Sequence, residues 1–133
     1  MNLVLASLPA AEYDCLAPHF VTRELRVGQV LAEPGDPLPS VWFPDSGAIS
    51  LIGVTPNADS VECALLGADG IFGISSVVPN LASPWRASVL FPGLARMLDA
   101  STFRRYLRHS PCLLEEVIRS STMLAAWPPK PVQ

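Results

Sequence analysis

The segment Gly70–Val89 carries the residue types and the spacing best suited to bind a ligand. A glycine followed by serines at the start of a helical turn, as in Gly73–Ser76, can present backbone N–H groups and hydroxyls to an anion. An arginine on the next extended segment, Arg86, can add a bidentate contact to the same anion. The segment therefore predicts a binding site for a small anion.

Each of these side chains also has an ordinary structural interpretation. Ser75 and Ser76 can equally be helix caps or small residues that allow close packing, and both interpretations stay open. Arg86 is either an anion clamp or, as we prefer, an arginine whose stem lies along a sheet face. Aromatic residues on short strands can stack on a ligand base, but they usually pack in the core, and we expect that of Trp42, Phe43 and Trp85.

Catalytic and metal-binding patterns are absent from the sequence. His19 and His109 are the only histidines, and no pair of residues has the spacing of metal ligands or of a nucleophile with its base. Cys15, Cys63 and Cys112 lie far apart and are odd in number, so we expect buried, reduced thiols. A thiol sensor would need an exposed cysteine with a low pKa. We predict that the chain is not an enzyme.

The composition restricts the partners of the chain. The 133 residues fit one domain, half of them are apolar, and the net charge of −3 argues against a nucleic-acid surface. The only basic cluster is Arg104, Arg105 and Arg108, which we interpret as the solvated end of a helix in preference to a nucleic-acid contact. No apolar run is long enough to span a membrane, and the apolar N-terminus lacks the basic residues of a secretory signal. We therefore expect a cytoplasmic protein without membrane contact.

The middle of the chain consists of short runs of alternating polarity, separated by turns rich in Pro, Gly, Asn and Asp. This pattern, with fourteen prolines in the whole chain, predicts a β-sandwich, barrel or jelly roll. The expected strands are Phe20–Leu25, Gln29–Ala32, Ser40–Phe43, Ala48–Val54, Ser60–Leu66, Arg86–Phe91 and Leu94–Leu98.

Helices are predicted at both ends of these strands. Pro9 begins a helix that runs to about Leu16, and Asp99 or Ser101 caps a second one through Arg108. Ser110 caps a final amphipathic helix, whose apolar stripe either packs on the sandwich or, as we expect, forms a dimer seam. The residues of that candidate seam are Leu113, Leu114, Val117, Ile118, Ser121 and Leu124. The domain thus covers residues 1–127, with a Pro-rich tail at 128–133.

The order and spacing of these motifs resemble the sensor domain of the Crp/Fnr family of transcription regulators, a cyclic-nucleotide-binding-like domain. The matching segments are Leu8–Tyr13, Gly28–Leu31, Glu33–Asp36, Val41–Pro44, Ser46–Gly47, Gly70–Gly73 and Arg86–Val89. The resemblance implies a double-stranded β-helix, or jelly roll, with dimerisation through the last helix. It also implies an effector site formed by Gly73, Ile74, Ser75, Ser76, Trp85, Arg86 and Ala87.

Three departures from the family pattern change the function that we expect. Ile74 stands where nucleotide-binding members place a glutamate on the ribose, and Trp85 stands at the position of the phosphate-binding arginine, one residue before Arg86. Losing both contacts would cost several kcal/mol, so tight binding of cyclic AMP is not expected. Nothing after Trp127 in this sequence resembles the family's DNA-binding domain, so we expect DNA to be reached only through a missing or separate domain.

We therefore expect an effector-sensing, dimerising domain in transcriptional control, which binds a small anionic or nucleotide-like effector. It carries no cofactor, because the clustered cysteines that hold an iron–sulfur cluster in some relatives are absent. The alternative is a stand-alone module that binds a ligand or a protein and is unrelated to transcription. A metal-dependent jelly-roll enzyme ranks last, since the chain lacks a His-x-His motif.

Overall fold

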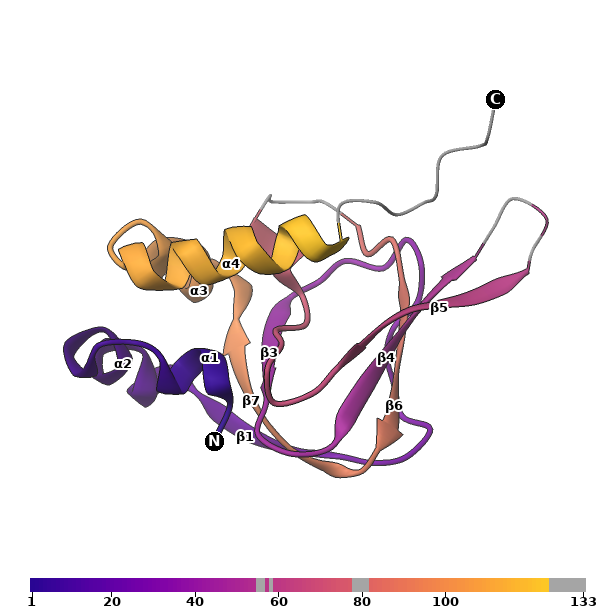
Figure 1. Cartoon of the computed structure of the whole chain (residues 1–133), viewed down its shortest axis with the longest axis horizontal. Coiled ribbons are helices and arrows are strands. Elements are labelled where there is room, and N and C mark those ends of the chain that lie inside the picture. Colours follow the sequence, from indigo (N-terminus) through magenta and orange to yellow (C-terminus); the bar gives the residue numbers. More distant parts are fainter. Residues whose placement is uncertain (55–56, 58, 78–81, 125–133) are drawn as a thin grey trace.

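The structure is a computed structural model that describes residues 1–54, 57, 59–77 and 82–124. Within these ranges, side chains are described for all residues except 54, 75, 77 and 120–124. The strands form two antiparallel sheets, and the helices gather on one side of the strands (Figure 1). This confirms the predicted fold class, which is mainly β with flanking helices in the jelly-roll arrangement.

The first sheet has three strands in the order β1-β7-β3. These strands are β1 (Val21–Leu25), β7 (Gly93–Asp99) and β3 (Ser40–Pro44). Side chains alternate across this sheet, so that Val41, Phe43 and Leu98 are fully buried between it and the helices. The first strand starts at Val21, one residue later than predicted.

The second sheet has four strands in the order β2-β6-β4-β5. They are β2 (Val30–Ala32), β6 (Arg86–Phe91), β4 (Ala48–Val54) and β5 (Ser60–Leu66). Ile49 lies opposite Val89, and Leu51 lies opposite Ala87. All four side chains are buried in a second core cluster that faces the first sheet. Phe43 and Trp85 are buried in the core clusters, and the partly buried Trp42 packs against the second one, which confirms the structural interpretation of these aromatic residues.

The N-terminal region differs from the prediction of one helix that starts at Pro9. A separate short helix, α1 (Leu3–Ala6), comes first, and Pro9 is the N-cap of α2 (Ala10–Leu16), which continues into η1 (Ala17–His19). The prediction of buried thiols is wrong for Cys15, which is exposed on α2, while Cys63 and Cys112 are half-buried. Leu16 turns inward next to Cys15, and two consecutive residues of a helix cannot share the centre of its buried face.

Two helices follow β7, and both begin at the predicted caps. α3 (Ala100–Leu107) starts at Asp99, whose carboxylate accepts hydrogen bonds from the backbone N–H groups of Ser101 and Thr102. α4 (Pro111–Leu124) starts after Ser110, whose hydroxyl accepts from the N–H of Leu113 at 3.3 Å. These caps satisfy donors that the first turn of a helix leaves free.

The cap at Asp99 makes stability depend on pH. The hydroxyl of Ser101 donates to its carboxylate, and this bond, the two backbone bonds and the nearby Arg104 outweigh desolvation and lower the pKa of Asp99. A carboxylate with a lowered pKa in the folded state contributes stability above its unfolded pKa, and this contribution is lost as the pH falls through the folded value. Asp99→Ala should therefore cost about 1 kcal/mol at neutral pH and progressively less in acid.

Urea unfolding of both proteins from neutral pH into the acid range measures this difference. Asp14→Ala is the control, because Asp14 is exposed and its carboxylate has no hydrogen bond among the described residues. An Asp99→Ala penalty that stays constant throughout acidification would show that the cap is not the source of the pH dependence.

Candidate functional site

The segment that leads into the predicted anion site is fixed to β3. Trp42 and Phe72 exchange two backbone hydrogen bonds, of 2.8 and 2.9 Å. Ile71 and Phe72 are buried, one in each core cluster. Gly73 follows with a φ of +98°, a conformation that glycine adopts without strain. The position of the next turn is therefore set by paired backbone and by buried side chains.

That next turn is η2 (Ile74–Val77), and it contains a buried hydroxyl with no partner. The N–H of Ser76 donates to the Gly73 carbonyl at 2.9 Å, which closes the turn. Ser76 is only 3% exposed, and its Oγ has no hydrogen-bond partner among the described residues. A buried hydroxyl without a partner costs about 1–3 kcal/mol. A polar atom of a ligand or a water molecule can satisfy this group.

A side chain from α3 holds the same turn from the other side. Arg104 donates from Nη1 to the carbonyl oxygen of Ser76 at 2.7 Å. This charge-assisted bond connects the candidate site directly with the C-terminal helices. Ile74 is buried in the first core cluster and offers no hydrogen-bond acceptor. The side chain of Ser75 lies outside the described residues.

The three candidate residues at the start of β6 lie on two faces. Trp85 and Ala87 are buried in the second core cluster, whereas Arg86 lies on the opposite face of the strand, where the side chains are partly exposed. Its Nε is 2.9 and 3.2 Å from the two carboxylate oxygens of Glu33, and both side chains are nearly half exposed. The structure therefore places Gly73, Ile74 and Ser76 at one turn, whereas Arg86 forms an ion pair with Glu33. An anion-binding role of Arg86 stays a prediction.

The sequence reasoning missed the partner of Arg86. The turn that contains Glu33 pairs with the segment before β6, since Gly35 donates to Ser83 and Ser83 donates to Asp36, each at 2.8 Å. Ala32 pairs with Ala87 in antiparallel strands, so Glu33, which follows Ala32, lies beside Arg86, which precedes Ala87. The opposite charges of Glu33 and Arg86 are compatible with an ion pair, but the pair can be predicted only when the register of the two strands is known.

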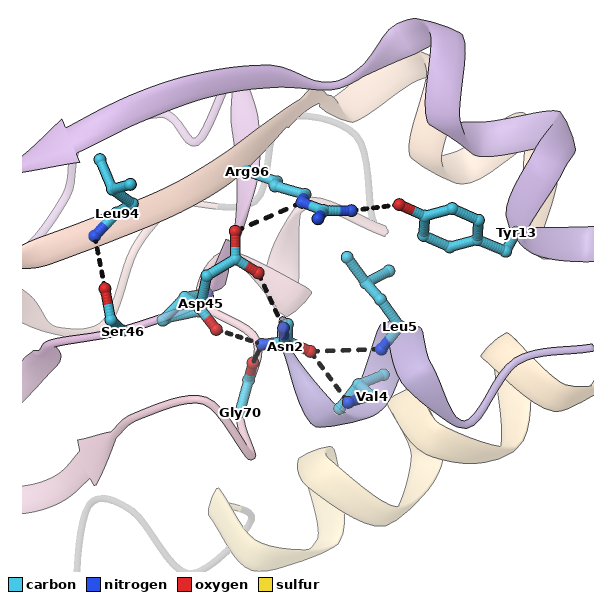
Figure 2. Close-up of polar contacts among 10 residues, drawn as sticks. Asn2, Val4, Leu5, Tyr13, Asp45, Ser46, Gly70, Leu94 and Arg96 are labelled. Atoms are coloured by element: carbon cyan, nitrogen blue, oxygen red, sulfur yellow. Dashed lines mark hydrogen bonds and ion pairs between the residues drawn. The ribbon is translucent and has the colours of Figure 1, made fainter. Parts of the chain in front are cut away.

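A positioning residue that the sequence reasoning also missed is Asn2, which is fully buried next to the segment that precedes the site (Figure 2). Its Nδ2 donates to the carbonyl oxygens of Pro44 and Gly70, at 2.8 and 2.9 Å. Its Oδ1 accepts from the N–H groups of Val4 and Leu5, at 2.9 and 3.3 Å. One side chain thus caps α1 and ties it to the end of β3 and to the residue before Ile71. An asparagine directly before a helical turn was the available signal.

The network extends from Asn2 to the first sheet and to α2 (Figure 2). The backbone N–H of Asn2 donates to Asp45 Oδ1 at 2.7 Å, and Asp45 Oδ2 lies 3.3 Å from Arg96 Nε. Arg96 also donates to the Tyr13 hydroxyl, and its guanidinium lies 5.8 Å from the centre of the Tyr13 ring. The N-terminal helices are therefore bound to the sheets by charged groups as well as by apolar packing.

The residues of the candidate dimer seam on α4 differ in burial. Leu113 and Val117 are buried in the first core cluster, so this half of the stripe packs on the domain. Leu114 is 43% and Ile118 is 58% exposed. The side chains of Ser121 and Leu124 lie outside the described residues, as does the tail at 128–133. Dimerisation through this helix stays a prediction.

Neither metal binding nor thiol chemistry finds support in the described residues. They contain no group of three or more His, Cys, Asp or Glu side chains that could hold a metal ion. Hydrogen bonding to Glu12 raises the pKa of the Cys112 thiol, and burial and the charge of Glu12 act in the same direction. A raised pKa disfavours the reactive thiolate. In the described part of the chain, no helix combines the length and apolar character needed to span a membrane.

The comparison with protein families gives the class of the protein. The model of the cyclic nucleotide-binding domain family matches residues 22–110, which is more than half of the chain. The chain belongs to this family. Its structural neighbours include regulators of the Crp type, in line with the resemblance in the sequence. None of the curated protein sequences matches the chain.

Solved structures with this fold come from several kinds of regulator. The regulatory subunit of a cAMP-independent protein kinase A from Trypanosoma brucei aligns with a TM-score of 0.79 and 16% identity, over 91% of this chain and 43% of that one. The catabolite activator protein of Thermus thermophilus aligns with a TM-score of 0.71 and 20% identity, over 92% and 56%. The chain therefore spans about half the length of these two proteins.

A third structure is similar in length. It is the N-terminal domain of a transcriptional regulator from Streptomyces coelicolor, with a TM-score of 0.69 and 18% identity over 93% of this chain and 89% of that domain. At such identities the likeness shows the fold alone.

Proposed function

We propose that the chain is an effector-sensing domain of the Crp/Fnr kind, which binds a small anionic or nucleotide-like effector at Gly73–Ser76. The observation that carries this function is the buried Ser76 hydroxyl, which has no partner among the described residues. The turn that holds it is fixed on one side by β3 and on the other by Arg104. A hydrogen bond from the effector to Ser76 would therefore act on a turn that α3 also holds.

The transmission of the signal follows from these contacts. If η2 has two conformations, an effector that binds one of them more tightly increases the population of that conformation. Arg104 couples the Ser76 carbonyl to α3, and α3 leads through Ser110 into α4. In this proposal α4 forms the seam of a homodimer, with the exposed Leu114 and Ile118 toward the partner. DNA is contacted only through a separate domain.

Cyclic AMP is not the effector that this turn favours. Ile74 offers no acceptor to a ribose hydroxyl, and Arg86 is already paired with Glu33. The absence of both contacts would weaken binding by several kcal/mol. The similar subunit from Trypanosoma brucei belongs to a kinase that is cAMP-independent, which supports the use of this fold without that ligand.

The alternative function is a stand-alone module for a ligand or a protein, unrelated to transcription. The observation that favours a protein-binding module is the apolar filling of the second core cluster, where Phe72 and Trp85 are buried and Trp42 packs against them. Side chains of this size leave less room for a nucleotide base between the sheets. In that case the turn at Gly73 is structural only.

Thermal unfolding with a panel of cyclic mono- and dinucleotides tests the proposed function. An effector at a hundred times its dissociation constant stabilises the folded protein by about 2.7 kcal/mol, which raises the midpoint by several degrees. Ser76→Ala should abolish the shift without lowering the stability of the free protein, because it removes an unsatisfied group.

Ser88→Ala is the control, because Ser88 pairs with Val30 and Ser50 within the second sheet and its loss should leave the shift unchanged. If no nucleotide of the panel shifts the midpoint, nucleotide sensing at this turn is wrong and the protein-binding alternative stands.

A further inference from the structure

Two exposed arginines at the C-terminal end of α3 form no ion pair with a carboxylate of the described residues. Arg26, Arg86, Arg96 and Arg119 each form an ion pair with a carboxylate. In contrast, Arg105 and Arg108 are exposed and have no ion pair within the described residues. Arg105 lies in the last turn of α3 and Arg108 is its C-cap, so the two are three residues apart at the same end of the helix.

The aromatic side chain of Tyr106 contacts both Arg105 and a histidine of the N-terminal region. The guanidinium of Arg105 lies 5.4 Å from the centre of the Tyr106 ring. The Tyr106 hydroxyl lies 3.2 Å from Nε2 of His19, which is exposed at the end of η1. His109, also exposed, follows directly in the sequence. We call these residues the α3 basic patch: His19, Arg105, Tyr106, Arg108 and His109.

We propose that the α3 basic patch binds an acidic segment of a partner protein. The patch combines guanidinium groups, which pair bidentately with carboxylates, with an aromatic ring and hydroxyl that add apolar area and a hydrogen bond. The chain as a whole has a net charge of −3, so the unpaired arginines of the patch differ in sign from the chain's overall charge. Such complementarity favours association with an acidic partner and fixes its orientation.

A nucleic acid fits this patch less well than a protein segment. Binding to a nucleic acid gains affinity with each phosphate that is neutralised, and one helical turn with two free arginines reaches few phosphates. The net charge of −3 also repels a polyanion that extends beyond the patch. A short acidic segment needs to contact only the patch itself.

The position of the patch connects it with η2. Arg104, next to Arg105 in the helix, donates to the carbonyl of Ser76. A partner that binds the C-terminal end of α3 therefore lies beside the contact between Arg104 and η2. The binding of the partner itself requires no effector, so it is separable from the function proposed above.

Fluorescence anisotropy with a labelled poly-glutamate peptide, a labelled neutral peptide of Ser and Gly, and a labelled DNA duplex tests the patch. We expect the acidic peptide to bind best and its affinity to fall with added salt. The double variant Arg105→Gln/Arg108→Gln should weaken this binding about tenfold, since two exposed charge contacts are lost.

The matched control is Arg23→Gln/Arg26→Gln, which removes the same charge from exposed side chains of β1 and of the turn that follows it. This variant should keep the affinity, and all variants should unfold at the temperature of the unchanged protein. An equal loss in both double variants would show a net-charge effect and overturn the assignment. Stronger binding of the duplex, or no binding of the acidic peptide, would overturn it as well.

Discussion

Gly73→Ala is expected to lower the free energy of unfolding by about 3 kcal/mol, through backbone strain and overpacking together. The backbone φ of +98° is unfavourable for any side chain. In addition, a Cβ at this position would lie 2.7 Å from the carbonyl oxygen of Ser40 and 3.3 Å from Cα of Val41. Both contacts are with backbone of β3, which cannot move without breaking the pairing with β7. Urea unfolding monitored by tryptophan fluorescence measures the loss.

Gly35→Ala separates the two causes. Gly35 has a φ of +90°, but a Cβ there meets no atom within 4 Å. This variant should therefore lose only the conformational part, about 1 kcal/mol. The difference between the two variants reports the close approach of Gly73 to β3. If both variants unfold at the same urea concentration, β3 does not constrain the turn, and the site geometry described above is wrong.

Asn2→Ala is expected to cost a similar amount, about 3 kcal/mol, for a different reason. It removes both donors to the carbonyl oxygens of Pro44 and Gly70, and the acceptor of two N–H groups at the start of α1. Buried polar groups that lose their partners cost more than the net value of the bonds themselves. Chemical denaturation measures the stability. Hydrogen exchange at the amides of residues 71–76 shows whether the loss reaches η2.

Ser7→Ala is the control for a general weakness of α1. The Ser7 hydroxyl donates to the Val4 carbonyl at 2.7 Å, but Ser7 is exposed, so water can replace this bond. We expect a change of less than about 1 kcal/mol. Equal losses in the two variants would mean that the Asn2 side chain does not anchor the N-terminal helix.

The strands were predictable because the turns that separate them are encoded locally. Gly28, Gly35 and Gly47 all have positive φ, and each lies in a turn that the sequence placed between two strands. The helix caps at Asp99 and Ser110 were predictable for the same reason, since a cap involves residues two or three positions apart. The helical turn that begins directly after Gly73 was also predicted from its local sequence.

The contacts between distant segments were not predictable from the residues alone. The Glu33–Arg86 ion pair depends on the register of β2 against β6, which includes an irregularity between Val30 and Ala32. Asn2 lies in an apolar stretch whose periodicity says nothing about residues 44 and 70. The jelly-roll order of the strands came from the family resemblance, because periodicity describes each strand and not its partner.

The pairing of β1 with β7 has a consequence for synthesis on the ribosome. Residues 21–25 pair with residues 93–97, so the first sheet closes only after the chain has been made as far as residue 97. The same holds for β3, which pairs with residues 95–99. Folds dominated by such distant pairs cross their folding barrier slowly. Until β7 emerges, Val41 and Phe43 on β3 lack the strand that completes their sheet, and in this interval aggregation competes with folding.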